Sequence, residues 1–472
     1  MTLNLRLALA LCVSLSLCAL LAVPGNFPSL GTDARLTLAV FALATCAWIG
    51  TPIDDTYIAL GAGLALTVTG VISSDTLFGT LGDSTVWLLI CAFVLAAAVT
   101  RTGLAGRVAV FLVGGARTVR QLTHLTTAAL VVTAFAVPAT SGRAALALPV
   151  FLALAKALAD RKRLVVMLAL LFPTVILLSA VATLIGAGAH LITVSVLWEA
   201  TGNRIGFTEW LLLGLPLAVV SSHLAAECVL LTTTRREDRQ GPVHITPEQI
   251  QEHSDRPVTG AWSQAEIRCA ALLGTVVLLW CSEPLHQVSP AVVALIGAVV
   301  ASSPALGTVR LKDALRTVPW SLLLFMAATM AMGVALADSG AAKWLVGGLP
   351  AGGVPPALFL TVVIVVSTAA HLVLQSRSAR SSVLVPLVVA AAVGAGVNPV
   401  AAALASTAAA GFCHTLPASA KPVTLFADIP GTPTYTPRDL LRLSAVLAPL
   451  TAALVLLFAV AVWPLLGVPV LR

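Results

Sequence analysis

Residues 133–151 read TAFAVPATSGRAALALPVF, and residues 370–388 read AHLVLQSRSARSSVLVPLV. Each stretch places a polar centre between two apolar arms. The centres are Thr140-Ser141-Gly142-Arg143 and Gln375-Ser376-Arg377-Ser378-Ala379-Arg380. Such a pattern is typical of a re-entrant hairpin, whose tip must lie in protein or a watery cavity because lipid offers the open backbone no hydrogen-bond partner. We therefore predict membrane hairpins over residues 122–159 and 355–396.

The rest of the chain is as apolar as these arms. Of its 472 residues 58% are hydrophobic and 10% charged, and the mean hydropathy is +1.00. A soluble domain could not cover itself with so few charges, whereas apolar runs of about 17–25 residues suit a bilayer. We predict an all-α polytopic membrane protein with about 11 transmembrane helices. They are placed at 5–23, 35–50, 53–72, 85–101, 164–197, 209–231, 265–281, 287–303, 319–338, 399–427 and 440–466. The spans at 164–197 and 399–427 are too long for one simple helix, so we predict an interruption in each.

The basic residues give this topology an orientation. With a cytoplasmic N-terminus, the cytoplasmic segments hold 18 lysines and arginines, and the opposite side holds four. This bias follows the positive-inside rule and predicts a multi-pass protein of the cell membrane. It also accounts for the net charge of +7 without a nucleic-acid partner.

The two hairpin regions belong to an internal repeat. Arg143 and Arg380 are separated by 237 residues, as are Ser141 and Ser378. Five crossings separate the copies, so the halves have opposite orientations, an arrangement typical of secondary transporters. We predict an N-terminal helix and loop (1–34), a first inverted repeat (35–232), a cytoplasmic loop (233–264) and a second repeat (265–472).

This arrangement resembles the divalent anion/sodium symporter family, within the wider ion-transporter superfamily. The resemblance covers about residues 35–466 and is best in the stretches 67–104, 144–149 and 320–325. It implies a homodimer with a fixed scaffold and a mobile part that moves like an elevator, and di- or tricarboxylate or sulfate substrates. The family's Ser-Asn-Thr signature at each hairpin tip aligns here with Ala139-Thr140-Ser141 and Ser376-Arg377-Ser378. Both asparagines are replaced, so sodium coupling does not follow from the resemblance.

The arginines at the tips are the strongest candidates for a substrate site. Arg143 and Arg380 hold the same register near the start of the second hairpin helix, where free N–H groups already favour an anion. An arginine near the membrane midplane costs roughly 2.5–3.5 kcal/mol, which a bound anion would offset. The alternative is that both arginines snorkel to the interface or pair with internal acids. Arg377 is a further candidate contact.

Other polar residues complete the predicted site. Hydroxyl groups of Thr140, Ser141, Ser376 and Ser378 could donate to the same anion, and Gly142 would let the backbone approach it. His190 and Lys421 lie at the predicted interruptions, and His190 is favoured over His371 and His414 as a residue that binds substrate or a proton. A site so rich in cations repels Na⁺, which favours coupling to protons or exchange. Backbone carbonyls at the interruptions leave sodium open as the coupling ion.

We therefore predict a secondary transporter of small anions, with no metal and no cofactor other than a coupling H⁺ or Na⁺. An exporter of an inorganic ion such as arsenite is the main alternative, although neutral cargo has no need of buried arginines. A membrane scaffold without transport is a second alternative, but it has no use for a costly polar midplane. No acid–base pair or metal cluster in the sequence supports an enzyme.

Overall fold

The computed structural model describes Ser16, Phe27 and residues 29–243, 245–252, 257–347 and 354–471. Helices and their connecting loops make up this part of the chain, which contains no strand beyond the isolated bridges Thr118–Pro242 and Val397–Leu471. The all-α prediction is therefore confirmed. The predicted span at 5–23 lies, apart from Ser16, outside the described residues.

The first half of the chain forms long helices with short 3₁₀ turns between some of them. Its elements are α2 (Thr32–Gly50), α3 (Asp55–Val68), α4 (Ser74–Gly79), η1 (Thr80–Gly82), α5 (Ser84–Thr102), α6 (Leu104–Val113), α7 (Val119–Ala136), α8 (Thr140–Ala157), α9 (Lys162–Leu178), η2 (Ser179–Ala182), η3 (Leu184–Gly186), α10 (Gly188–Thr201) and α11 (Phe207–Thr233). Two short helices, α12 (Arg236–Gln240) and α13 (Pro247–Glu252), lie in the loop that follows.

The second half has a similar order of elements. They are α14 (Gln264–Cys281), α15 (Glu283–His286), α16 (Pro290–Ser302), α17 (Leu311–Thr317), α18 (Trp320–Asp338), α19 (Ala341–Gly347), α20 (Pro356–Ala369), η4 (Ala370–Leu372), α21 (Arg377–Gly394), α22 (Pro399–Ala409), η5 (Pro417–Ser419), α23 (Lys421–Ala427), α24 (Pro437–Leu457), the π-helical η6 (Phe458–Val462) and η7 (Trp463–Leu466).

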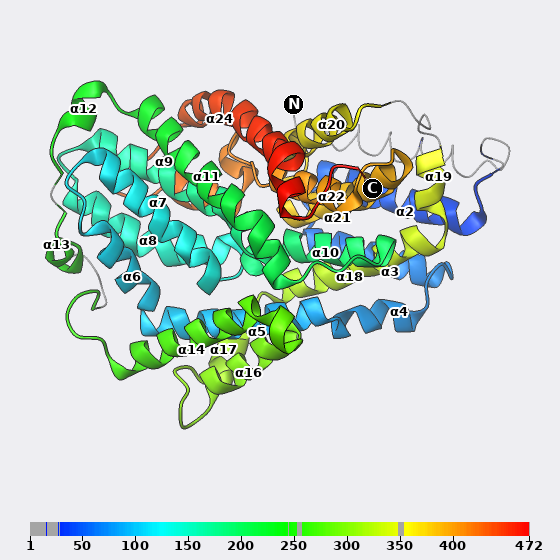
Figure 1. The fold of residues 1–472 in the computed structure, drawn as a ribbon, viewed down its shortest axis with the longest axis horizontal. Helices are drawn as coiled ribbons and strands as arrows, with labels where there is room; N and C mark the ends of the chain where they lie inside the picture. The colour runs from blue at the N-terminus through cyan, green and yellow to red at the C-terminus, as the bar shows by residue number, and fades with distance from the viewer. Residues whose placement is uncertain are drawn as a thin grey trace.

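Among the described residues, eight helical segments are long and apolar enough to cross a membrane, and several shorter apolar helices accompany them. Most of these helices run along the long axis of the molecule (Figure 1). Their outward faces carry many exposed leucines, valines and isoleucines, as expected where lipid is the solvent. The protein is therefore a multi-pass membrane protein.

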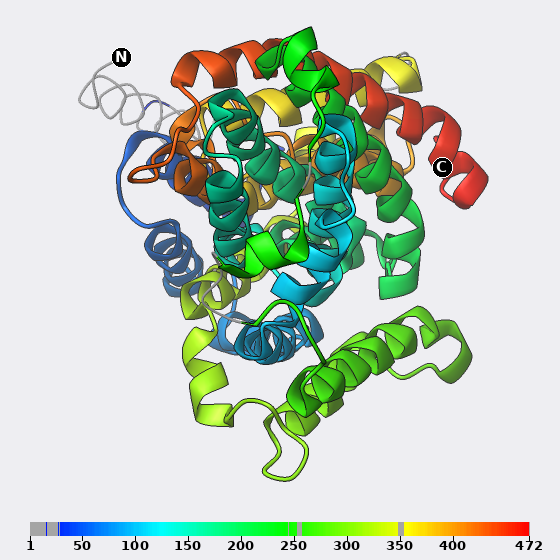
Figure 2. The same cartoon turned by 90° about the vertical axis from the view of Figure 1, so that its left-hand side faces the viewer.

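The helices form two groups. Along one side, α5 packs against α16, and α14 packs against α16 in turn (Figure 1). Figure 2 shows the green and yellow-green helices of this group along the lower edge of the molecule. The other group surrounds α9, whose apolar side chains are almost all buried, and includes α7, α8, α11 and α23. The hairpin helix α21 packs closely on α10, so the central elements of both halves meet there.

Both predicted hairpin regions consist of two helices joined by a short turn. The first turn spans Val137–Ala139 between α7 and α8, and Ala139 adopts a left-handed φ of 68°. The second lies between η4 and α21, where the hydroxyl of Ser376 caps α21 by accepting from the N–H of Ala379 (3.3 Å). A proline interrupts each second helix, Pro149 in α8 and Pro386 in α21, as the repeat predicts.

Both predicted interruptions are also present. The chain leaves α-helical geometry between α9 and α10, at residues 179–187, and again between α22 and α23, at residues 410–420, where short 3₁₀ turns take its place. A side chain at Gly186 would bring its Cβ within 2.1 Å of the Ala180 carbonyl oxygen, so the first interruption requires a glycine there. The inverted orientation of the two halves, and the division into domains, stay predictions.

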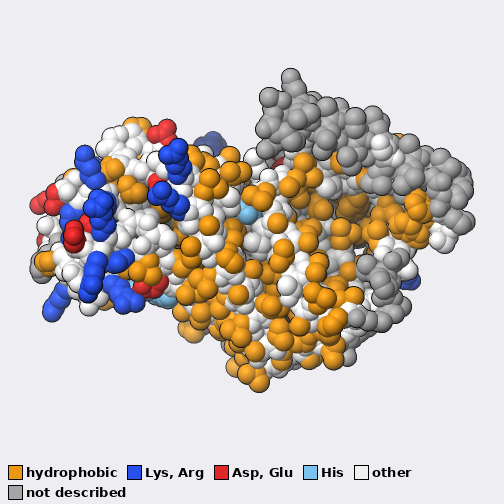
Figure 3. Space-filling model, turned by 90° about the horizontal axis from the view of Figure 1, so that it is seen from above, with side chains coloured by type: hydrophobic (Ala, Val, Ile, Leu, Met, Phe, Trp, Pro, Cys, Tyr) orange, Lys and Arg blue, Asp and Glu red, His pale blue; other side chains and the backbone are white. Residues whose placement is uncertain are grey.

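Lysine and arginine side chains gather at one end of the molecule, the end at which Figure 1 places α12 and α13 (Figure 3). The loop between the two halves is fastened across this end. Arg161 donates to the carbonyls of Pro242 (3.0 Å) and Asp238 (2.9 Å). A hydrogen bond from the backbone N–H of Arg235, with Arg163 nearby, lowers the pKa of Asp238. This end of the molecule is therefore strongly basic, and hydrogen bonds from Arg161 hold part of the loop against it.

Candidate functional site

Arg143 is fully buried and hydrogen-bonded on nearly every side. Its Nε donates to the Thr133 hydroxyl (2.9 Å), its Nη1 to the Ile176 carbonyl (3.0 Å), and its Nη2 to the Leu130 carbonyl (2.6 Å) and the Ser179 hydroxyl (2.7 Å). All four acceptors are neutral. The guanidinium therefore joins α8 to α7 and to the end of α9, but no partner cancels its charge.

Arg377 reaches the same helix end from the other half of the chain. Its Nη1 donates to the Leu177 carbonyl (3.4 Å), one residue beyond the carbonyl that Arg143 uses. Carbonyls at a helix C-terminus carry partial negative charge, so the end of α9 stabilises both cations in part. The structure thus brings the tips of both hairpin regions together at the first interruption.

His190 lies beside Arg377, in the first turn of α10. Because a guanidinium only donates, His190 Nε2 accepts from Arg377 Nη2 (3.1 Å). Its Nδ1 then carries the ring proton and donates to the Thr183 carbonyl (3.0 Å), and Trp210 packs on the ring face with centroids 4.8 Å apart. The neutral imidazole is therefore held on three sides and positions Arg377, whose Nε is buried without a partner.

Arg380 is the counterpart of Arg143 in the repeat, but its surroundings differ. It is also fully buried, yet its one hydrogen bond runs from Nη1 to the Phe412 carbonyl, at 3.4 Å. Its Nε and Nη2 have no partner among the described residues. These two nitrogens form one edge of the guanidinium, with parallel N–H bonds that match two oxygens of a carboxylate or sulfate. A complete bidentate donor is therefore buried and unused.

The difference between Arg143 and Arg380 comes from their neighbours. At the repeat offset of 237 residues, the position of Thr133 is taken by Ala370, which has no hydroxyl to offer. The other acceptor on the first hairpin helix is the backbone carbonyl of Leu130, and the carbonyl of Ser367 at the matching position does not accept from Arg380. Arg380 therefore lacks the two acceptors that Arg143 finds on the first helix of its hairpin.

The segment Gly411–His414 lines this site. Phe412 accepts from Arg380, and a Cβ on Gly411 would lie 3.1 Å from Arg377 Nη2. His414 is fully buried near Arg380; its Nδ1 accepts from the Cys413 N–H (3.4 Å), which places the ring proton on Nε2, and the Thr174 backbone lies close to the ring. His414 is outside the set of residues predicted from the sequence, because a lone histidine in an apolar run gives no signal of its contacts.

The remaining predicted residues are less central. Thr140 and Gly142 are half-buried at the start of α8, and Ser378 is half-buried close to Gly188 of α10. Ser141 and Lys421 are exposed, so the structure does not bring them into the buried group.

Carboxylates do not compensate the three arginines. The described residues form six ion pairs, and none includes Arg143, Arg377 or Arg380. The buried Arg107–Glu266 pair (2.7 Å), for example, joins α6 to α14 instead. Burying an unpaired ion costs on the order of several kcal/mol. The described residues also form no group of three metal-binding side chains. The chemistry of the site is thus that of cationic and neutral donors, which suits an anion.

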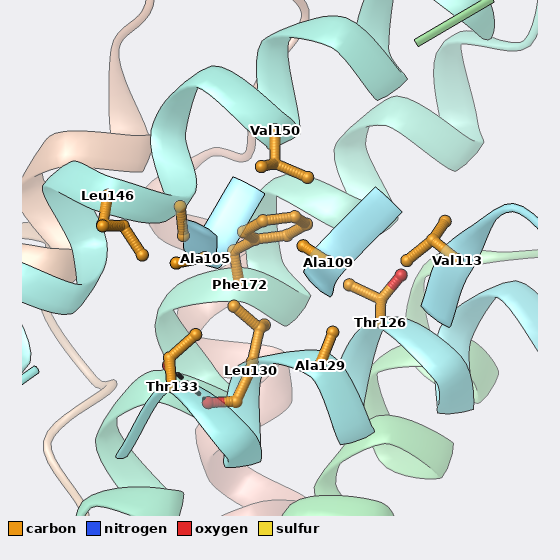
Figure 4. A pocket seen from close by; sticks show the side chains of 11 residues that line it. Ala105, Ala109, Val113, Thr126, Ala129, Leu130, Thr133, Leu146, Val150 and Phe172 are labelled. Carbon is orange, nitrogen blue, oxygen red and sulfur yellow. Dashed lines mark hydrogen bonds between the residues drawn. The ribbon is translucent and has the colours of Figure 1, made fainter. Parts of the chain in front are cut away.

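Two cavities adjoin this centre. One of about 20 Å³ lies between α6, α7 and α8 and is lined by apolar side chains and by Thr126 and Thr133 (Figure 4); it has room for about one water molecule. The other, of about 490 Å³, lies between α20 and α24. Its lining includes His371, Phe412 and Thr415, so it reaches the segment that contacts Arg380.

The chain is similar to known proteins over most of its length. The family model described as the sodium:sulfate symporter transmembrane region matches residues 2–468. A membrane protein of Cupriavidus necator is 26% identical over 396 residues, which cover 80% of this chain and 74% of that protein. The YdaH transporter of Alcanivorax borkumensis has a similar fold (TM-score 0.57, 16% identity, 94% of this chain and 100% of that one). MtrF of Neisseria gonorrhoeae, described with a class of antimetabolite efflux pumps, gives a TM-score of 0.59 at 13% identity, over 94% of this chain and 97% of that one.

Proposed function

The chain belongs to the family of the sodium:sulfate symporter transmembrane region, and from that membership we propose that it carries a small oxyanion, a di- or tricarboxylate or sulfate, by secondary active transport. Membership establishes a membrane transporter of a small anion rather than an enzyme. The nature of the anion is the proposal, and it rests on the site.

One observation supports this choice of cargo above the others. The Nε and Nη2 of Arg380 are buried, adjacent and unpartnered. Leaving buried donors unsatisfied costs about 1–3 kcal/mol for a neutral group and more for a charged one. Two oxygens of one anion would satisfy both. The unpartnered Nε of Arg377 is a further donor, and both Arg377 and His414 lie close to Arg380.

The proposed transport mechanism is inferred from the way the helices pack into two groups. We propose that α7–α11 and α20–α24 move together as an elevator against the group formed by α5, α14 and α16, in a homodimer. The close packing of α21 on α10 and of α8 on α9 supports a single moving body. The basic end in Figure 3 supports a cytoplasmic location for α12 and α13, hence a cytoplasmic N-terminus in the cell membrane.

The alternatives fit the site less well. An arsenite carrier would move a neutral molecule, which would leave the three arginine charges uncompensated. Efflux of antimetabolites, the class of pumps with which MtrF is described, concerns a protein only 13% identical to this one. A scaffold without transport would gain nothing from an unused bidentate donor.

The test is uptake of [³⁵S]sulfate and [¹⁴C]succinate by proteoliposomes. We expect saturable uptake of at least one of them by the wild-type protein. Arg380→Gln should lower it by at least about tenfold, because two charge-assisted hydrogen bonds are lost. Arg380→Lys keeps the charge but lacks the paired edge, so it should also be strongly impaired.

Arg310→Gln is the matched control, since this exposed arginine only pairs with Asp313 on its own helix turn (2.7 Å). It should transport as the wild type does. Saturable anion uptake that is unchanged in Arg380→Gln would contradict the assignment of Arg380.

A further inference from the structure

A second group of ionisable side chains lies between α7 and α11. The Nδ1 atoms of His124 and His223 are 2.8 Å apart, and the two rings are stacked with centroids 5.1 Å apart. His124 Nε2 lies 2.6 Å from Glu227 Oε1, to which Arg120 Nε also donates (2.7 Å). This group joins the first helix of the first hairpin to α11, and the proposed anion site makes no use of it.

The contacts determine where the protons of the two rings lie. Glu227 Oε1 accepts from Arg120, so the His124 Nε2 that faces the same oxygen carries a proton and donates. A hydrogen bond between the two Nδ1 atoms needs a proton on one atom and a lone pair on the other. The neutral pair meets this condition, and so does a pair with one added proton. A second added proton would leave no acceptor and would place two positive charges side by side.

Water reaches the pair, and few other charges do. The side chains of His124 and Glu227 are 30% and 24% exposed, and Arg120 in the first turn of α7 is 69% exposed. The Cys228 thiol lies near Glu227. Within the described ranges, α6, α9, α12 and α24 pack on α7 or α11 without a hydrogen bond or ion pair to either ring. Glu227 is therefore the carboxylate that compensates an added proton, and Arg120 already shares it.

The helix held by this pair also positions Arg143. Further along α7, the Leu130 carbonyl and the Thr133 hydroxyl accept from that guanidinium. The bond between His124 and His223 fixes the beginning of the same helix to α11. Loss of this bond would free that end of the hairpin helix, and Arg143 would no longer be held in one place.

We propose that His124 and His223 form a proton-binding site that fastens the first hairpin to α11 and releases it when the pair takes up a second proton. An imidazole ordinarily titrates at about pH 6.5, so release belongs to mildly acidic conditions. The bond is present at neutral pH and is lost as the pH falls. Transport therefore slows in acid; this last step rests on the proposed function, whereas the proton-binding site does not.

Hydrogen exchange of the purified protein tests the release. Exchange of α7 peptides is measured at about pH 7.5 and about pH 5.5, corrected for the intrinsic effect of pH, with α9 peptides as the internal reference. In the wild type we expect α7 to exchange at least about fivefold faster at the lower pH, relative to α9. His223→Asn carries an amide that can donate to His124 or accept from it, so its α7 should exchange equally at both.

His286→Gln is the matched control, because His286 bonds only within its own loop, to the Leu279 carbonyl and the Val288 N–H. It should respond to acid as the wild type does. If His223→Asn does not fold, His223→Gln provides the same comparison. The same acid response in the wild type and the His223 variant, or no response in the wild type, would overturn the proposal.

Uptake of [³⁵S]sulfate by proteoliposomes at the same two pH values tests the effect on transport. The ratio of wild type to His223→Asn cancels any effect of pH on the substrate or the bilayer. We expect a ratio near one at neutral pH and a several-fold lower ratio in acid. A constant ratio would overturn the link to transport. No saturable uptake of sulfate or succinate by either protein would contradict the proposed function, and hydrogen exchange would still decide the proton-binding site.

Discussion

At the scale of single residues, hydrogen-bond partners divide the arginines into two kinds. Arg143 uses four protein acceptors and holds three helices together. Arg380 uses one and keeps a free edge. The same residue type in the same repeat position therefore serves structure in one half of the chain and is available for a ligand in the other.

This division predicts opposite effects on stability. Without any anion, Arg143→Gln should lower the free energy of unfolding by about 2–4 kcal/mol, because buried acceptors lose their donors. Arg380→Gln should leave stability unchanged or raise it, because it removes an unpartnered buried cation. Thermal unfolding of the detergent-purified proteins measures both.

Adding the transported anion then tests whether Arg380 binds it. It should raise the unfolding temperature of the wild type and not that of Arg380→Gln. Destabilisation of both variants to the same extent would show that the two arginines have equivalent structural roles.

The sequence could not have separated these arginines. Both follow a hydroxyl residue by two positions and precede a proline by six. What differs is Thr133 against Ala370, on another helix, together with Ser179 at the end of α9. Such partners come from tertiary packing, which a linear pattern does not display. For the same reason the sequence ranks His414 below His190, since the proximity of His414 to Arg380 comes from tertiary packing.

At the scale of elements, the patterns in the sequence were more informative. Polar centres within apolar runs correctly predicted the turns before α8 and α21, and the long apolar runs correctly predicted the interruptions after α9 and α22. Helix ends fell within a few residues of the predicted bounds, because caps such as Ser376 and Ser263 fix them locally. The first interruption depends on a close backbone contact at Gly186, and a substitution there tests how much that contact matters.

Gly186→Ala is expected to disrupt the first interruption. The added Cβ would lie 2.1 Å from the Ala180 carbonyl oxygen, which is backbone and cannot move aside easily. We expect a loss of at least about 2 kcal/mol in stability, within the range for overpacking. Gly61→Ala in α3, where a Cβ meets nothing within 4 Å, should be neutral or slightly stabilising. Thermal unfolding and the yield of folded protein compare the two; equal behaviour would show that the interruption tolerates a side chain.

At the scale of the whole molecule, charge and apolar surface are separated along the long axis. Basic side chains gather at one end and apolar side chains cover the face beyond it (Figure 3). On the face shown in Figure 3 the basic side chains are thus concentrated rather than spread, a pattern that favours one orientation in a membrane.

Labelling of single cysteines tests that orientation. A cysteine in place of Arg236, in α12, should react with a membrane-impermeant maleimide only after cells are permeabilised. A cysteine in place of Arg204, in the loop between α10 and α11, should react in intact cells. The wild-type protein gives the background from the native thiols. The reverse pattern would invert the proposed topology.

The neighbouring carbonyls of Ile176 and Leu177 have one more consequence. Arg143 binds the first and Arg377 the second, so both hairpins are anchored on consecutive peptide units of one helix. Displacing either hairpin should tilt the peptide group that its arginine contacts, and with it the neighbouring peptide group that the other arginine contacts. A substitution that displaces one hairpin should therefore also displace the other. The effects of substitutions in the two hairpins should not be additive. Because the two hairpins share this anchorage, they should move together. A small molecule bound beneath either hairpin tip would then immobilise both hairpins.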